Sequence, residues 1–80
     1  MNLYLVSQEA NRDYDTFDSF VIAAPDEETA RNTHPNGGII DWRKADWRSD
    51  WAFEPEQVVS KLIGTTETEQ GVICASFNAG

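Results

Sequence analysis

Hydrophobic positions along the chain gather into four short runs that are separated by polar stretches. The continuous apolar run at residues 3–6 predicts a strand that is covered on both faces or is at least central in a sheet. Strand-favouring side chains return at residues 17–24 after the polar, turn-prone stretch 8–16, so we expect these two strands to pair as a hairpin across a long acidic loop. Residues 57–65 and 71–77 predict a third and a fourth strand.

The fourth predicted strand alternates in character along its length. The alternation places two sets of residues on opposite faces: Val72, Cys74 and Ser76, and Ile73, Ala75 and Phe77. We expect the second set to face the core, because it is the more apolar of the two. Polar residues 66–70 separate this strand from the third and indicate a turn, so hairpins are expected at both ends of the chain.

Residues 24–31, APDEETAR, carry the signals of a helix start. Asp26 can accept hydrogen bonds from the first free backbone N–H groups of the helix. Glu27 and Glu28 lie where the positive end of the helix dipole favours carboxylates. These three acids therefore have a sufficient structural reason to be present.

The helix should be short, because Pro35 disfavours helical geometry at His34 and residues 36–38 supply a turn. A partial positive charge on His34 would suit the C-terminal end of the helix dipole. Since Ala30 is the main apolar residue of the helix, this element cannot cover a four-stranded sheet alone. Additional cover must come from the segment that follows.

The order of the predicted elements indicates one α+β domain over residues 1–80 with two layers. We expect a four-stranded antiparallel sheet, with one short helix and a Trp-rich irregular segment packed on one of its faces, in the order ββαββ.

All three tryptophans of the chain lie within the eleven residues DWRKADWRSDW at 41–51. Burying one aromatic ring removes about 150–250 Å² from water, so one or two of these rings would supply much of the missing cover. The candidates for this cover are Ile39, Ile40, Trp42, Trp47, Trp51 and Phe53. We therefore expect at least one tryptophan to belong to the core.

The same segment is also a candidate contact surface. It contains three of the six basic residues of the chain, and Trp and Arg are the residue types most enriched at binding hot spots. The candidate contact residues in this segment are Trp42, Arg43, Trp47 and Arg48. A division is expected, in which some rings are buried and one ring with an arginine faces a partner.

The charge balance narrows the range of partners. Fourteen acidic residues against six basic ones give a formal net charge of −8. Direct binding to nucleic acid or to an anionic membrane surface normally depends on clustered Lys and Arg, so neither is expected. The acidity either keeps the protein soluble or forms a surface that meets a basic groove on another protein. The candidate contacts without an obvious structural role are Glu9, Asp13, Asp15, Asp18, Glu67 and Glu69.

No constellation for chemistry is visible in the sequence. One Cys and one His are too few for a structural zinc site, and no Ser or Cys stands in a motif with a base. Cys74, between apolar neighbours, is expected to be a small buried side chain. We therefore expect no enzyme activity, metal or cofactor. A single cysteine and the lack of a signal peptide indicate a cytoplasmic protein.

The frame LYLVSQ…YDTFDSFVIAAPDEETAR, closing with GVICASFNAG, resembles small acidic proteins encoded by phages and mobile elements. In size, acidity and expected element order the chain is also similar to several anti-CRISPR proteins. That resemblance implies an inhibitor that binds a bacterial protein or ribonucleoprotein complex at a basic groove, in the bacterial host cell. The alternative is a homodimeric accessory protein with no defence target, which hides its exposed strand edges by self-association.

Overall fold

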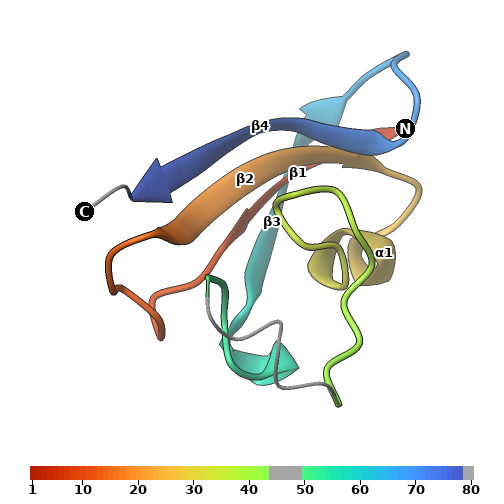
Figure 1. Cartoon of the computed structure of the whole chain (residues 1–80). Coiled ribbons are helices and arrows are strands. Elements are labelled where there is room, and N and C mark those ends of the chain that lie inside the picture. Colours follow the sequence, from red (N-terminus) through yellow and green to blue (C-terminus); the bar gives the residue numbers. More distant parts are fainter. Residues whose placement is uncertain (44–49, 79–80) are drawn as a thin grey trace.

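Four antiparallel strands form one sheet in the spatial order β3-β1-β2-β4 (Figure 1). The strands are β1 (Asn2–Ser7), β2 (Thr16–Ala24), β3 (Val59–Thr65) and β4 (Gly71–Asn78). The helix α1 (Glu27–Arg31) and the 3-10 turn η2 (Pro55–Gln57) lie between β2 and β3 in the chain. This computed structural model describes residues 1–43 and 50–78. A small domain with a four-stranded antiparallel sheet and one short helix agrees with the predicted α+β class.

The first two strands pair as the predicted hairpin. Their register runs from Asn2 opposite Ala24 to Ser7 opposite Ser19. The first strand is central, as expected, with β2 on one side and β3 on the other. It is not covered on both faces, because Leu5 is 37% exposed.

The prediction of a second hairpin at the C-terminal end is wrong. β3 pairs with β1 and β4 pairs with β2, so these two strands form the opposite edges of the sheet. Residues 66–70 cross the end of the sheet at which β1 begins, and Thr66 is bonded to Met1 there through N···O contacts of 2.8 and 3.0 Å. A polar connection of five residues is compatible with either topology, which is why the sequence pattern could not choose between them.

The predicted core face of the fourth strand is also partly wrong. Val72 lies opposite the buried Ile22 and packs against the core, whereas Ile73 is 51% exposed. The register shifts between Val21 and Ile22, and a second shift lies between Phe17 and Ser19. Because an inserted residue reverses the face of the side chains on its far side, simple alternation assigns Val72 and Ile73 incorrectly. Ala75, opposite the buried Phe20, and Phe77, against Phe17, lie on the core face as expected, although both are exposed.

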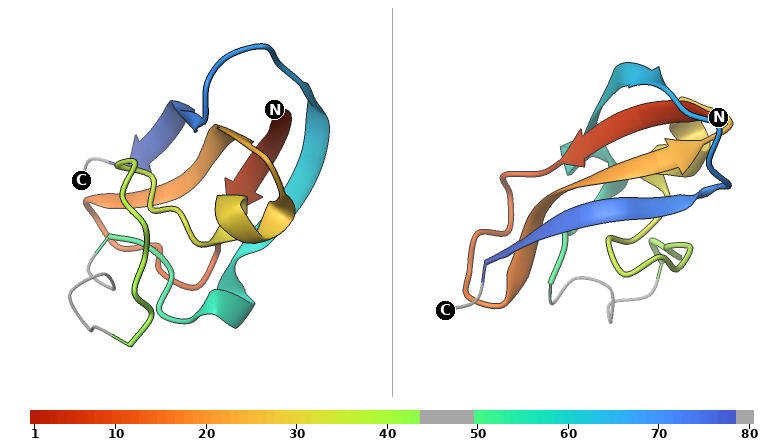
Figure 2. Two further views of the ribbon diagram at one scale, coloured as in Figure 1. Left: turned by 90° about the vertical axis from the view of Figure 1, so that its right-hand side faces the viewer. Right: turned by 90° about the horizontal axis from the view of Figure 1, so that it is seen from above.

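The expectation that Cys74 is buried is wrong as well. Its side chain is exposed and its thiol is free. Cys74 lies opposite Val21 on the face of the sheet that looks away from the buried Phe20 and Ile22. α1 and residues 32–43, which follow it, lie on the other side (Figures 1 and 2). An apolar neighbourhood in the sequence therefore did not mean a covered position.

The hydrophobic core lies between the two central strands and the segments that cover them. Every buried apolar residue within a strand belongs to β1 or β2, among the residues that the structure describes: Tyr4, Val6, Phe20, Ile22, Ala23 and Ala24. From outside the sheet the core adds Ala30, Ile40, Trp51, Ala52 and Val58. No described residue of β3 or β4 is buried, so the second layer covers only the middle of the sheet.

Trp51 supplies the largest piece of the cover. It is fully buried, and its ring meets that of Phe20 edge to face with centroids 5.3 Å apart. Ile40 is buried, and Trp42 is partly buried against the same cluster. Two of the other candidates for this cover, Ile39 and Phe53, are exposed. Trp47 lies outside the described residues.

The helix begins as the sequence predicts. Asp26 has extended backbone geometry, and its side chain accepts a hydrogen bond of 2.8 Å from the backbone N–H of Thr29. Glu27 and Glu28 occupy the first turn, and Ala30 is buried. Hydrogen bonds from the side chain and then the backbone of Thr29 lower the pKa of Asp26 below its ordinary value.

This cap predicts a pH dependence of stability. A group whose pKa is lower in the folded state stabilises the fold above its ordinary pKa, and the contribution is lost as the pH falls through the folded value. Asp26→Ala should therefore lower the urea midpoint at pH 7, with a difference from wild type that shrinks as the pH is brought below about 4. Asp26→Asn, which keeps a capping side chain without a charge, should be nearly neutral at low pH. A difference between Asp26→Ala and wild type that is constant from pH 3 to 7 would contradict this account.

His34 does not act at the helix end as predicted. The C-cap is Asn32, and His34 is buried with 1% exposure. Its Nδ1 accepts a hydrogen bond of 3.0 Å from the backbone N–H of Asn36, so Nε2 carries the proton that it donates to Asp50 Oδ1 at 2.7 Å. The ring thus links the turn at residues 36–38 to Asp50, the residue directly before Trp51. Gly37, within that turn, has a φ of +103°.

Candidate functional site

The predicted acidic contacts fall into two groups at opposite ends of the sheet. The first group is exposed and lies where β1 ends and β2 begins: Glu9, Asp13, Asp15 and Asp18. Glu67 and Glu69 are exposed in the connection that crosses the other end of the sheet, beside Met1. The structure therefore brings the first four together and does not bring the last two to them. We call residues 8–18 the acidic loop.

Gln8 holds the base of the acidic loop. Its side chain is 3% exposed, and its amide nitrogen donates to the carbonyl oxygens of Asn11 at 2.8 Å and Phe17 at 2.9 Å. Its amide oxygen accepts from the backbone N–H of Asn11 at 2.8 Å. One buried side chain thus satisfies three backbone groups of the loop, where regular pairing has stopped.

Asn11 ties the acidic loop to the second layer. Its side chain is 4% exposed and its amide nitrogen donates to the carbonyl oxygen of Trp51 at 3.0 Å. The loop and the buried indole are therefore parts of one structural unit. Neither Gln8 nor Asn11 was identified from the sequence, because polar residues after a strand usually face solvent and nothing local distinguishes buried ones.

The far end of the acidic loop is held against the last residue of β4. Asp15 donates its backbone N–H to Asn78 O at 2.7 Å, and its φ of +61° is a left-handed conformation that aspartate tolerates better than most residues. The carbonyl oxygen of Asp13 accepts from Thr16 Oγ1 at 2.7 Å and from Asn78 Nδ2 at 3.4 Å. These bonds use backbone groups of the two aspartates and leave both carboxylates exposed.

The carboxylates of the acidic loop have few internal partners. None of the four forms an ion pair within residues 1–43 and 50–78. Asp18 accepts one hydrogen bond, from Ser19 Oγ at 3.2 Å. Glu9 and Asp18, together with Arg12, line an open groove of about 980 Å³ that runs from the loop to η2. The loop thus presents fixed, largely unneutralised negative charge beside a concave surface.

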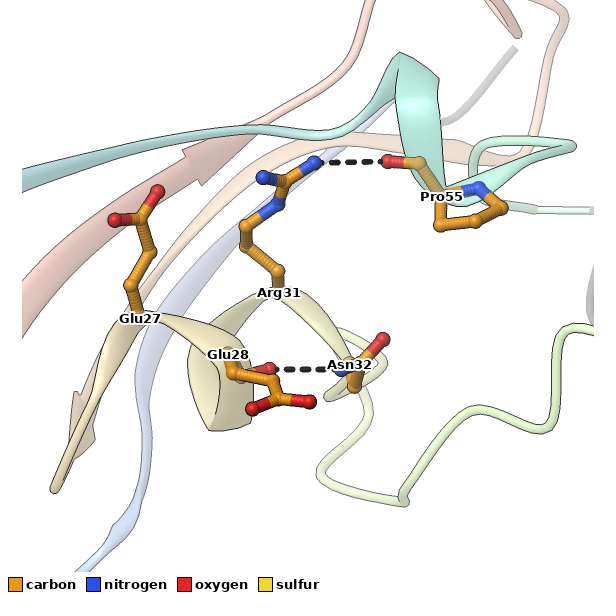
Figure 3. A pocket seen from close by; sticks show the side chains of 5 residues that line it. All are labelled: Glu27, Glu28, Arg31, Asn32 and Pro55. Carbon is orange, nitrogen blue, oxygen red and sulfur yellow. Dashed lines mark hydrogen bonds between the residues drawn. The ribbon is translucent and has the colours of Figure 1, made fainter.

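A second, smaller hollow beside α1 is lined by Glu27, Glu28, Arg31, Asn32 and Pro55 and has a volume of about 420 Å³ (Figure 3). Arg31 Nη2 donates to Pro55 O at 3.1 Å, and Asn32 Nδ2 donates to Glu28 O at 2.9 Å. Glu27 accepts from Ser60 Oγ of β3 at 2.6 Å. These polar groups hold α1 against η2 and β3. We therefore interpret the hollow as a structural contact between these elements and not as a binding site.

The predicted contacts in residues 41–51, which we call the Trp segment, are only partly described. Trp42 donates its indole N–H to Asn32 Oδ1 at 2.8 Å and is partly buried. Arg43 is exposed and its Nε lies 3.1 Å from Asp41 Oδ1, a hydrogen bond that raises the pKa of the guanidinium above its ordinary value. Trp47 and Arg48 lie outside the described residues. Of the four predicted contacts, Arg43 is therefore the one seen to face solvent.

The described part of the chain contains no group of three or more His, Cys, Asp or Glu side chains that could hold a metal ion. None of its helices has both the length and the apolar character needed to cross a membrane. Comparison with protein-family models, with curated proteins and with solved structures finds no match for this chain.

Proposed function

We propose that this protein acts by binding, through its acidic loop, to a basic groove on a bacterial protein or ribonucleoprotein complex. The observation that carries the proposal is the fixed backbone of the loop. Buried Gln8 and Asn11 and the contacts of Asp13 and Asp15 with Asn78 hold it in place, while its carboxylates face solvent. A surface ordered before binding loses less conformational entropy on association than a flexible acidic tail would.

The charge of the molecule supports this class of partner. With a net charge of −8, the protein is attracted over long range to a positively charged channel, and its association is accelerated there. Carboxylates that occupy such a channel compete with phosphate groups for the same Lys and Arg side chains. We therefore propose inhibition of a nucleic-acid-binding defence complex, the mode of action that the resemblance to anti-CRISPR proteins implies.

Glu67 and Glu69 have a secondary place in this proposal. They lie at the far end of a molecule whose longest extent is 33 Å. A groove that contacted both ends would have to follow the whole length of the sheet. The acidic loop alone is sufficient for a contact of limited size, so the later glutamates provide a natural comparison.

We also propose that Trp42 and Trp51 complete the second layer of a ββαββ sandwich, with Arg43 at the border of the contact surface. Burial of Trp51 and partial burial of Trp42 support this arrangement at the two ends of the segment. The exposed guanidinium of Arg43 supports a place at the border.

Matched charge removal tests the proposed contact. Asp13→Asn with Asp15→Asn and Glu67→Gln with Glu69→Gln each change the net charge from −8 to −6. Proteins captured from a bacterial lysate would be identified by mass spectrometry, and the affinity of each purified partner measured by calorimetry. We expect the first pair to weaken binding roughly tenfold or more and the second pair to change it less than about threefold.

The salt dependence of the same complex provides the second readout. Raising the salt from 0.1 to 0.5 M should weaken binding about tenfold or more, because it screens the attraction between exposed charges. Excess duplex nucleic acid should displace the protein from its partner. Equal effects of the two charge pairs, or binding that salt does not change, would contradict a contact through the acidic loop.

A further inference from the structure

The edge strand β4 has an unusual surface for this acidic chain. It is one of the two edges of the sheet, and no described segment pairs with its outer side. Residues 73–78 are all exposed, including Ile73 at 51% and Phe77 at 48%. The strand contains no charged residue and no proline over its eight residues.

Soluble proteins usually protect an open edge with a charge, a proline or a covering segment, because the free N–H and C=O groups are a template for another strand. The other edge, β3, has such protection. Lys61 lies within it, and Ser60 is bonded to Glu27 of α1 at 2.6 Å. β4 has none of these protections among the described residues; its pairing with β2 shifts near Ile73 and again opposite Ser76 and Phe77, but residues 74–78 all keep partners in β2.

We propose that β4 is a self-association surface that pairs antiparallel with β4 of a second copy of this chain. Two copies with a charge of −8 each repel one another, so a dimer must form where few carboxylates face each other. A strand without ionised side chains meets that requirement, and it offers nothing to a basic partner. Its outward backbone groups would pair across a two-fold axis perpendicular to the sheet.

The geometry of this pairing determines what lies near the axis. Rotation about an axis perpendicular to the sheet keeps each face on its own side, so residues opposite one another must share a face. An axis near the middle of the strand brings Cys74 close to Cys74 of the second copy. Phe77 is 48% exposed in the single chain, because the second layer does not reach the β4 edge. In the dimer, residues from β4 of the second copy would lie beside its ring.

Acidic residues flank both ends of the strand and give the dimer a distinctive salt dependence. Asp13 and Asp15 are bonded to Asn78, and Glu69 lies two residues before Gly71. Antiparallel pairing places these ends beside each other. We therefore expect the dimer to tighten at least threefold as salt rises from 0.05 to 0.5 M, because screening reduces this repulsion. Binding through the acidic loop has the opposite salt dependence, so either idea can fail while the other holds.

Sedimentation of the full chain from 5 to 200 μM tests the interface with a matched pair of variants. Ser76→Lys adds a charge to the β4 edge and Val59→Lys adds the same charge to the β3 edge, so both have a net charge of −7. We expect the first to weaken the dimer at least tenfold and the second to leave it within about threefold of wild type. Circular dichroism establishes that both variants are folded.

Cross-linking of the wild-type chain gives an answer that does not depend on the stability of a variant. Because the chain has a single cysteine, a short bis-maleimide can link two copies only through Cys74. In 0.5 M salt we expect a covalent dimer that forms at least tenfold faster than in Cys74→Ser with Glu56→Cys, where the thiol is moved to an exposed residue beside β3. A monomer at 200 μM with equally slow cross-linking in both proteins would overturn the proposal. So would a dimer that Val59→Lys weakens and Ser76→Lys does not.

Discussion

Replacement of Trp51 by alanine is expected to remove about 3–5 kcal/mol from the free energy of unfolding. A chain of 80 residues has a total stability of roughly 4–12 kcal/mol, so the loss is about a quarter of the stability or more, and at the low end of this range the variant would be largely unfolded at 25 °C. The effect is large because Trp51 is fully buried and packs on Phe20. In addition, no described residue of β3 or β4 is buried, so the edge strands add no buried side chain to the core. Urea titration followed by far-ultraviolet circular dichroism measures it without relying on tryptophan fluorescence.

Trp51→Phe is the control for this prediction. It keeps an aromatic ring against Phe20 and removes an indole N–H that has no hydrogen-bond partner among the described residues. Loss of an unsatisfied buried donor offsets part of the lost packing, so we expect a cost of about 1–2 kcal/mol. A Trp51→Ala variant as stable as wild type would show that the second layer does not depend on this ring.

Replacement of Gln8 by methionine is expected to cost about 2–3 kcal/mol of stability and to weaken binding by the acidic loop. Methionine has nearly the same size but leaves three buried or partly buried backbone hydrogen bonds unmade, among them the N–H of Asn11. The carboxylates of the acidic loop would then lose their fixed positions. Urea titration measures the stability, and hydrogen exchange of the Asn11 amide measures the order of the loop.

Gln57→Met is the matched control, because Gln57 also binds two backbone N–H groups through its side-chain oxygen but does so at an exposed site. Water can replace the lost partner there, so the cost should be below about 1 kcal/mol. If Gln8→Met were as mild as Gln57→Met, or if it left partner affinity unchanged at equal folding, the role assigned to a rigid loop would be wrong.

The two proposed contacts occupy different parts of the surface. The acidic loop lies at one end of the sheet, whereas β4 is an edge that ends at that loop through Asn78. A dimer formed through β4 would therefore present two acidic loops, one beside each end of the paired strands. Its tightening in salt and the weakening of partner binding in salt are separate measurements on the same protein.

Local features of the fold could be predicted from the sequence because they depend on neighbouring residues. The hydrophobic runs indicated where β1, β2 and β4 lie, to within about one residue. Asp26 was identified as a cap because its side chain reaches a backbone group only three residues away. The third strand begins two residues later than predicted, because η2 occupies Pro55–Gln57. The hairpin between the first two strands was predicted correctly, but succession in the chain was not a sufficient reason, because β3 and β4 also follow one another and do not pair.

The acidic loop could be predicted only in part. Its carboxylates were identified by elimination, since charges without a structural role were assigned to the surface. The residues that position them were not identified, because Gln8 bonds to the backbone nine residues away at Phe17 and Asn11 bonds to the backbone of Trp51, forty residues away. Glu67 and Glu69 were placed in the same group by charge, although the strand order puts them at the opposite end.

The sequence by itself determined the number of strands, the start of the helix, the strong negative charge and the need for a tryptophan to complete the core. Only the tertiary structure decided that β3 and β4 lie on opposite edges, that His34 is buried against Asp50, and that Cys74 faces solvent. The physical reason is the range of the interactions. Hydrophobic alternation and capping act over a few residues, whereas strand order, register shifts and burial depend on contacts between residues far apart in the chain.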